Sequence, residues 1–180
     1  MKIVQWIEIV VVEKRDELRN MRIDALWSLL RIALGFIFFW AFLDKLLGLN
    51  FATPHGKSWL DGVSPTAGFL EFAVKGPFTK LFNSLSGIPL IDWIFMAGLL
   101  LIGLAFILGI GQKIAGYSGA VLIFLIYITQ LPLKNNPLID EHIIYLLLFL
   151  IFSKNEVGLN FSIHKWWERT NLVKKYKILK

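Results

Sequence analysis

Four long apolar stretches limit what this chain can fold into. Residues 25–43, 93–110, 114–131 and about 137–153 are apolar over nearly the length of about 20 residues that a helix needs to cross a bilayer. Hydrophobic residues make up 56% of the 180 residues and charged residues 18%, which argues against a soluble domain and against a disordered chain. We therefore expect an all-α membrane protein, a four-transmembrane-helix bundle.

The basic residues predict how the bundle is oriented and divided. Thirteen lysines and arginines lie before the first stretch, in the link 111–113 or after the fourth stretch, and four lie in the segments 50–92 and 132–136 on the other side. The excess is typical of cytoplasmic segments, so both termini are expected in the cytoplasm of a multi-pass protein of the cell membrane. The predicted parts are an N-terminal cytoplasmic segment 1–23, a membrane domain 24–153 and a basic tail 154–180. Tryptophans beside lysines in this tail favour contact with membrane lipid, and we expect no nucleic-acid partner.

The long segment between the first two spans is predicted to carry two short amphipathic helices on the outer surface. Ser64 and Pro65 form a helix-start signal. A second helix is indicated by an apolar stripe of Phe78, Leu81, Phe82 and Leu85. Such a lid either only covers the bundle or closes a site. The apolar run 3–12 is too short to span and is either an interfacial helix or a strand that pairs with a partner chain.

Ionisable residues in the fourth span give the strongest functional signal. Asp140, Glu141 and His142 are expected inside the outer part of the membrane, where each costs about 2.5–3.5 kcal/mol and usually lines a cavity or a pathway. Asn136 and Pro137 resemble a helix cap and a first helical residue. The three side chains should not share one face of that helix, because successive residues are 100° apart. The alternative is structural: one acid caps the helix or pairs with a nearby lysine, Lys134.

The first span offers groups at the same outer level. Asp44 and Lys45 end it, and Trp40 lies one turn below Asp44. Arg31 lies roughly 10 Å deep from the cytoplasmic side, and it either snorkels to the surface or balances a buried acid. The chain has no cysteine, and His142 is the one histidine expected within the membrane. We therefore expect no thiolate zinc, no bis-histidine haem and no other metal.

Four sequence blocks resemble the DoxX/DoxD family of small four-helix membrane proteins. They are LLRIALGFIFFWAFLDKL, WLDGVSPTAGFLEFAVKGPF, and the pair MAGLLLIGLAFILGIGQKIAG and NNPLIDEHIIYLLLF, covering about residues 26–167. The family includes the membrane subunit of a thiosulfate:quinone oxidoreductase of sulfur-oxidising archaea, which pairs with a smaller subunit, DoxA. The resemblance implies oxidation of thiosulfate to tetrathionate, with quinone as the electron acceptor. The alternative is a non-catalytic accessory subunit of a respiratory complex, for instance beside a terminal quinol oxidase.

The residues can be assigned to this chemistry by type. A thiosulfate dianion needs cationic or N–H donors at an outward mouth, for which the candidates are Lys45, Ser64, Thr66 and Asn136. A quinone needs an apolar slot, for which the candidates are Trp40, Asp44 and Tyr145. Asp140, Glu141 and His142 are the candidate catalytic residues, exchanging the protons. No metal or flavin site is legible, so the electrons pass either without such a group or with help from the partner.

Overall fold

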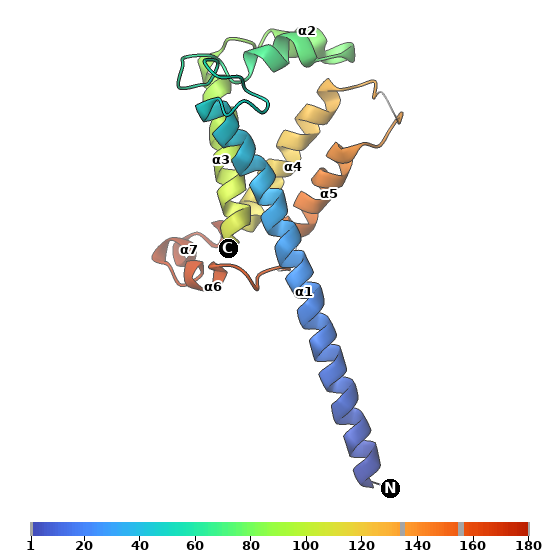
Figure 1. Cartoon of the computed structure of the whole chain (residues 1–180). Coiled ribbons are helices and arrows are strands. Elements are labelled where there is room, and N and C mark those ends of the chain that lie inside the picture. The colour runs from blue at the N-terminus through green and yellow to red at the C-terminus, as the bar shows by residue number, and fades with distance from the viewer. Residues whose placement is uncertain (1, 134–135, 155–156, 180) are drawn as a thin grey trace.

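The structure, a computed structural model, describes residues 2–133, 136–154 and 157–179, and helices are its only regular secondary structure over these ranges. Four longer helices form the body of the molecule (Figure 1): α1 (Lys2–Leu47), α3 (Pro89–Leu108), α4 (Gln112–Thr129) and α5 (Glu141–Lys154). The short elements are η1 (Phe69–Ala73), η2 (Gly76–Phe78), α2 (Thr79–Asn83), α6 (His164–Trp167), α7 (Asn171–Lys175) and η3 (Lys177–Leu179).

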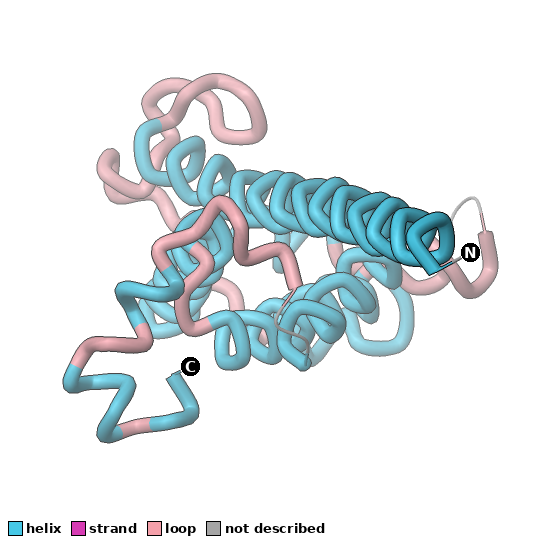
Figure 2. The backbone as a smooth tube through the Cα atoms, turned by 90° about the horizontal axis from the view of Figure 1, so that it is seen from below, coloured by secondary structure: helices cyan, strands magenta, loops and turns pink. Residues whose placement is uncertain are grey.

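Three of the described helices are long and apolar enough to cross a membrane: the part of α1 over Glu13–Leu47, then α3 and α4. This confirms an all-helical membrane protein. In α1 the apolar run 3–12 continues as helix into the bundle, so the strand alternative for this run is wrong. In Figure 1 the first half of α1 projects away from the other helices, and Figure 2 shows the C-terminal segment beside the bundle at that same end. We call this the tail end and the opposite end, which carries residues 48–88, the lid end.

The start of α5 differs from the predicted one in both its first residue and its cap. It contains 14 residues and begins at Glu141, four residues later than Pro137. The Oδ1 atom of Asn136 accepts the N–H groups of Leu138 and Ile139, so Asn136 stabilises a turn and does not cap the helix. The cap is Asp140, whose Oδ1 atom accepts the N–H of His142 at 3.0 Å. The prediction that Asn136 caps the helix is therefore wrong, and the alternative that an acid caps it is confirmed.

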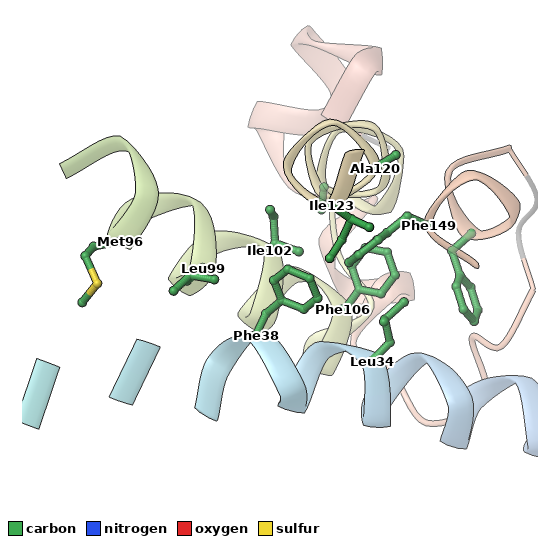
Figure 3. Packing of buried hydrophobic residues seen from close by; sticks show 11 residues of the cluster. Leu34, Phe38, Met96, Leu99, Ile102, Phe106, Ala120, Ile123 and Phe149 are labelled. Atoms are coloured by element: carbon green, nitrogen blue, oxygen red, sulfur yellow. The ribbon is translucent and has the colours of Figure 1, made fainter. Parts of the chain in front are cut away.

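Aromatic side chains form the centre of the core (Figure 3). Phe149 of α5 is fully buried, and its ring meets those of Phe38 and Phe106 edge-on at centroid distances of 5.1 and 4.9 Å. Phe152 continues the cluster toward the tail end, where its ring meets that of Trp27 at 5.8 Å. Edge-to-face contacts at these separations add to the burial of the rings. The core thus joins α1, α3 and α5 through rings from each.

Glycines let the helix pairs approach closely. A Cβ atom on Gly103 of α3 would lie 2.7 Å from the backbone nitrogen of Phe39 in α1. A Cβ on Gly119 of α4 would lie 2.6 Å from the ring of Phe149 in α5. Small residues at helix contacts are what allow backbones in lipid to pack by van der Waals contact. Accordingly, α1 packs mainly on α3, and α5 packs mainly on α4.

Arg31 lies fully buried, which differs from both expectations for it. Its guanidinium donates to the carbonyls of Phe106 and Ile107 in the last turn of α3. It also donates to the carbonyls of Gly158, at 2.9 Å, and Phe161, at 2.7 Å. The side chain therefore does not snorkel, and among the described residues it pairs with no acid.

The end of α3 explains why no acid is needed. Gly109 takes a left-handed conformation, and the Gly109 and Ile110 amides both donate to the carbonyl of Ala105. The next two carbonyls of α3 have no partner within the helix, and these are the two that Arg31 binds. The C-terminal end of a helix is also the negative end of its dipole, which favours a cation there. Carbonyl groups and the dipole thus take the place of a carboxylate.

Candidate functional site

Asp140 and His142 form the best-defined polar pair at the lid end of α5. The Nδ1 atom of His142 lies 2.8 Å from Oδ2 of Asp140. The two side chains are 19% and 18% exposed, so water reaches them while protein covers most of each. One Asp140 oxygen caps the helix, and the other orients the imidazole. A carboxylate that fixes one ring nitrogen leaves the other, Nε2, to exchange a proton.

Glu141 completes a convergent group of three. Ligand atoms of Asp140, Glu141 and His142 all lie within 4.8 Å of one another, close enough to surround one cation or one proton donor. The expectation about helix faces treated all three residues as helical, whereas only Glu141 and His142 lie within α5. Asp140 precedes the first helical residue, and its backbone therefore departs from the 100° rotation. Glu141 is exposed, whereas the other two are half-buried.

The groups of the first span do not reach this cluster among the described residues. The Asp44 carboxylate is 2% exposed and accepts the amides of Phe51, Ala52 and Thr53 at 3.3, 3.0 and 2.8 Å. Its charge is therefore used to hold the lid's first turn. The ammonium of Lys45 lies 6.0 Å from the ring centre of Phe95 in α3. The expected meeting of Asp44 or Lys45 with the cluster is not seen, because α1 packs on α3 while α5 packs on α4.

Ser64 and Thr66, predicted as anion donors, bind an acid of the chain itself. Both hydroxyls donate to Oδ1 of Asp92, at 2.8 and 2.5 Å, and this carboxylate is 7% exposed. Asp92 lies in the first turn of α3, which begins four residues earlier than predicted. Ser64 also accepts the amide of Ala67 and so holds the turn that leads into η1, which begins at Phe69. A dianion at these hydroxyls would have to approach a buried carboxylate that already occupies them.

Asp92 is the polar residue that the sequence analysis missed. The signal was available: an acid four residues after Ile88 and three after Pro89, at the start of a span. Acids near a helix N-terminus are stabilised by its dipole. The lid is fastened here as well as at Asp44, so two buried carboxylates hold it at two points.

The two proposed quinone-slot aromatics lie in separate ring contacts. Trp40 stacks on Phe36 at 6.0 Å and meets Phe51 of the lid edge-on at 5.2 Å. Tyr145 packs against the main core. No hydrogen bond or ring contact joins the two among the described residues. A cavity of about 740 Å³ lies at the tail end instead, beside Trp27, Val157 and four acids of α1.

The lid contains the expected short helices, with one face only partly buried. Phe82 is buried in a second cluster with Leu70 and Val74, and Leu85 packs against it. Phe78 and Leu81 are 41% and 60% exposed, so half of the predicted stripe faces outward. The lid therefore covers the bundle end through its own small core.

No protein-family model, curated protein or solved structure matches the chain. What the fold and the site define is a class: a small helical membrane protein with a fastened lid and an acid–histidine pair at the lid end.

Proposed function

We propose that the chain is the membrane subunit of a thiosulfate:quinone oxidoreductase, with the lid end facing outward. The observation that carries this proposal is the Asp140–His142 pair, 2.8 Å apart and half-buried at the start of a membrane helix. Reduction of a quinone needs two protons for every two electrons, and a carboxylate-oriented imidazole is suited to deliver them. The sequence blocks that resemble the DoxX/DoxD family supply the substrate class.

In this proposal α5 serves as a fourth span. Its 14 residues measure about 21 Å, which is shorter than a hydrocarbon core of about 30 Å. The non-helical residues 136–140 lie on the lid side of its start, and their polar groups bind one another. Four spans would return both termini to one side, and the basic residues favour the cytoplasmic side of a cell membrane.

The chemistry balances without a cofactor of the chain. Two thiosulfate dianions lose one electron each and form the central sulfur–sulfur bond of tetrathionate. The quinone takes up both electrons and two protons to become the quinol. We assign proton delivery to His142, oriented by Asp140, with Glu141 as the exposed relay to water. Lys45 is the remaining candidate cation for thiosulfate, since Ser64 and Thr66 are engaged by Asp92. A DoxA-like small subunit would complete the anion site.

The test is thiosulfate-dependent reduction of a quinone analogue by the purified chain, alone and with the products of neighbouring genes. Asp140→Asn and His142→Gln should lower the turnover at least about tenfold, because each removes a group of the proton path. Glu71→Gln is the matched control, since Glu71 is an exposed lid acid bonded to Ser86 and lies outside the pair. Unchanged turnover in a folded Asp140→Asn or His142→Gln complex would remove the pair from the reaction.

One observation favours a second candidate, a non-catalytic accessory subunit of a respiratory complex. Both predicted anion-binding hydroxyls are engaged by the buried Asp92 carboxylate. The lid would then only cover the bundle. Co-purification with terminal oxidase subunits, together with absent thiosulfate turnover, would favour this candidate.

A further inference from the structure

The first half of α1 projects away from the other helices (Figure 1), and its residues 13–23 border an open cavity with Val157 and Asn160 of the loop. From Lys2 to Ile23 it extends over about 33 Å beyond the bundle. Asp24, which accepts the amide of Gly158, is its first residue to hydrogen-bond another element. The sequence of this half is rich in valine and isoleucine, which are poor helix formers. A lone helix of this length and composition is marginal in water, since most helical stability in proteins comes from packing.

The spacing of apolar residues along this helix is that of a coiled-coil seam. Alternating steps of three and four residues define positions 4, 7, 11, 14, 18, 21 and 25, and six of these seven are apolar. They are Val4, Ile7, Val11, Lys14, Leu18, Met21 and Ala25. Within the part whose side chains are described, Leu18 and Met21 are 49% and 59% exposed. The seam is therefore exposed to solvent at Lys14, Leu18 and Met21 and half-buried at Ala25.

The chain's own loop borders this seam near Met21, where Val157 and Asn160 line an open cavity together with residues of α1. Asp24 and Arg31 bind Gly158 and Phe161, so these two loop residues lie against another side of α1. At 100° per residue, the seam is rotated by about 100° from these two residues. A partner on the seam would thus lie beside the bundle, next to the open cavity at Met21 and away from the loop residues that Asp24 and Arg31 bind.

The charges that flank the seam suit a second copy of this chain. In the heptad with Leu18 at position a, Glu17 is at position g and Arg22 at the following position e. In a parallel, in-register pair, g of one helix meets e of the other five residues on. Glu17 of each copy would meet Arg22 of the other, which gives two attractive pairs. Because the opposite charges lie on the same helix, the complementarity is homotypic.

The membrane supplies the remaining condition. Copies of one membrane protein share one orientation, so their α1 helices are parallel and leave the bilayer at the same level. This fixes both the direction and the register of pairing. We propose that residues 4–25 of α1 form a parallel two-stranded coiled coil with a second copy of this chain, which makes the protein a homodimer.

The absence of cysteine from the natural sequence makes a direct test possible. The Leu18→Cys variant of the full chain places a thiol in the seam, and Asp16→Cys, at position f, places one on the far side of the proposed pair. Mild oxidation in membranes should cross-link Leu18→Cys severalfold more than Asp16→Cys. Equal cross-linking of the two variants, or cross-linking of neither, would overturn the proposal.

Charge reversal gives a second, independent readout. Glu17→Arg and Arg22→Glu should each raise the dimer dissociation constant severalfold by light scattering in detergent, because like charges then face one another. The double variant, Glu17→Arg with Arg22→Glu, should restore the affinity. If instead the helix binds the membrane surface or a different protein, the purified chain is monomeric and the double variant rescues nothing. That result also overturns the proposal.

Discussion

Replacing Arg31 by methionine should loosen the tail end of the protein more than any surface change. The Arg31→Met variant keeps an unbranched apolar stem and removes the charge and the donors. Four carbonyl groups then lose their bonds, those of Phe106, Ile107, Gly158 and Phe161. Two of them end α3 and two belong to the loop after α5. The substitution therefore weakens both a helix end and the docking of the loop.

The magnitude can be worked from the number of bonds. Hydrogen bonds from a charged donor contribute about 1.5–3 kcal/mol each, so four give about 6–12 kcal/mol. Desolvation of the buried guanidinium, several kcal/mol, offsets part of this. We expect a net loss of about 3–5 kcal/mol, the usual result of removing one partner of a buried charged network. Arg31→Lys should lose almost as much, because an ammonium cannot reach carbonyls that surround a planar guanidinium.

The assay combines unfolding with proteolysis. Unfolding of the purified protein in detergent reports the free energy, and cleavage within residues 158–162 reports release of the loop. Arg19→Met is the matched control: its side chain is 68% exposed and pairs with Asp16 at 3.1 Å, so it should change stability by less than about 1 kcal/mol. If Arg31→Met unfolds within about 1 kcal/mol of the wild type and its loop stays protected, the four-carbonyl account of Arg31 is refuted.

Three further predictions concern the helix contacts and the lid. Gly103→Ala should lower the free energy of unfolding by about 2 kcal/mol, because the added Cβ overpacks against α1. Gly98→Ala on the same helix is the control: a Cβ there meets nothing within 4 Å, so the change should be neutral or stabilising. Equal effects of the two variants in a thermal melt would contradict the close approach of α3 to α1. Asp92→Ala should leave the hydroxyls of Ser64 and Thr66 without their acceptor and speed protease cleavage of the lid. A cleavage rate equal to that of the wild type would mean that Asp92 does not fasten the lid. Hydrogen bonds from Ser58 hold the pKa of the Asp61 carboxyl below its ordinary value. These bonds therefore stabilise the lid fully when the pH is above the ordinary pKa of an aspartate, and the stabilisation is lost as the pH falls through the lowered pKa of Asp61. Cleavage of the lid by pepsin should accordingly rise on acidification in the wild type, while Asp61→Asn should lack this pH dependence.

Much of the helical framework could be predicted, because apolar length alone identifies membrane helices. The predicted spans 93–110 and 114–131 correspond to α3 and α4, which begin four and two residues earlier. The start of α5 was harder to predict, because two nearby residues could each cap the helix. Asn136 and Asp140 are both residue types that often cap helices. In the structure the Asn136 side chain accepts an amide of a turn, and the Asp140 side chain accepts an amide of the helix. Sequence alone does not rank two such caps.

The polar contacts were harder to predict because they depend on which helices are neighbours. Asp44 was expected to face α5, yet α1 packs on α3, and the carboxylate binds lid amides instead. Arg31 was expected to seek water or an acid. Its actual partners are backbone carbonyls, which every residue has and no sequence pattern marks. The same reason hid the role of Asp92, whose partners Ser64 and Thr66 were assigned to a substrate.

The central claim is that quinone is reduced with protons delivered by Asp140 and His142 at an outward lid end. Proton uptake by oriented vesicles tests it most directly. The complex is placed in vesicles in a known orientation, thiosulfate and a quinone are supplied, and the pH is followed on each side. The account predicts uptake of two protons per tetrathionate from the compartment that faces the lid, with uptake lost in His142→Gln. Proton uptake from the side of the termini, or tetrathionate formation undiminished in His142→Gln, would contradict it.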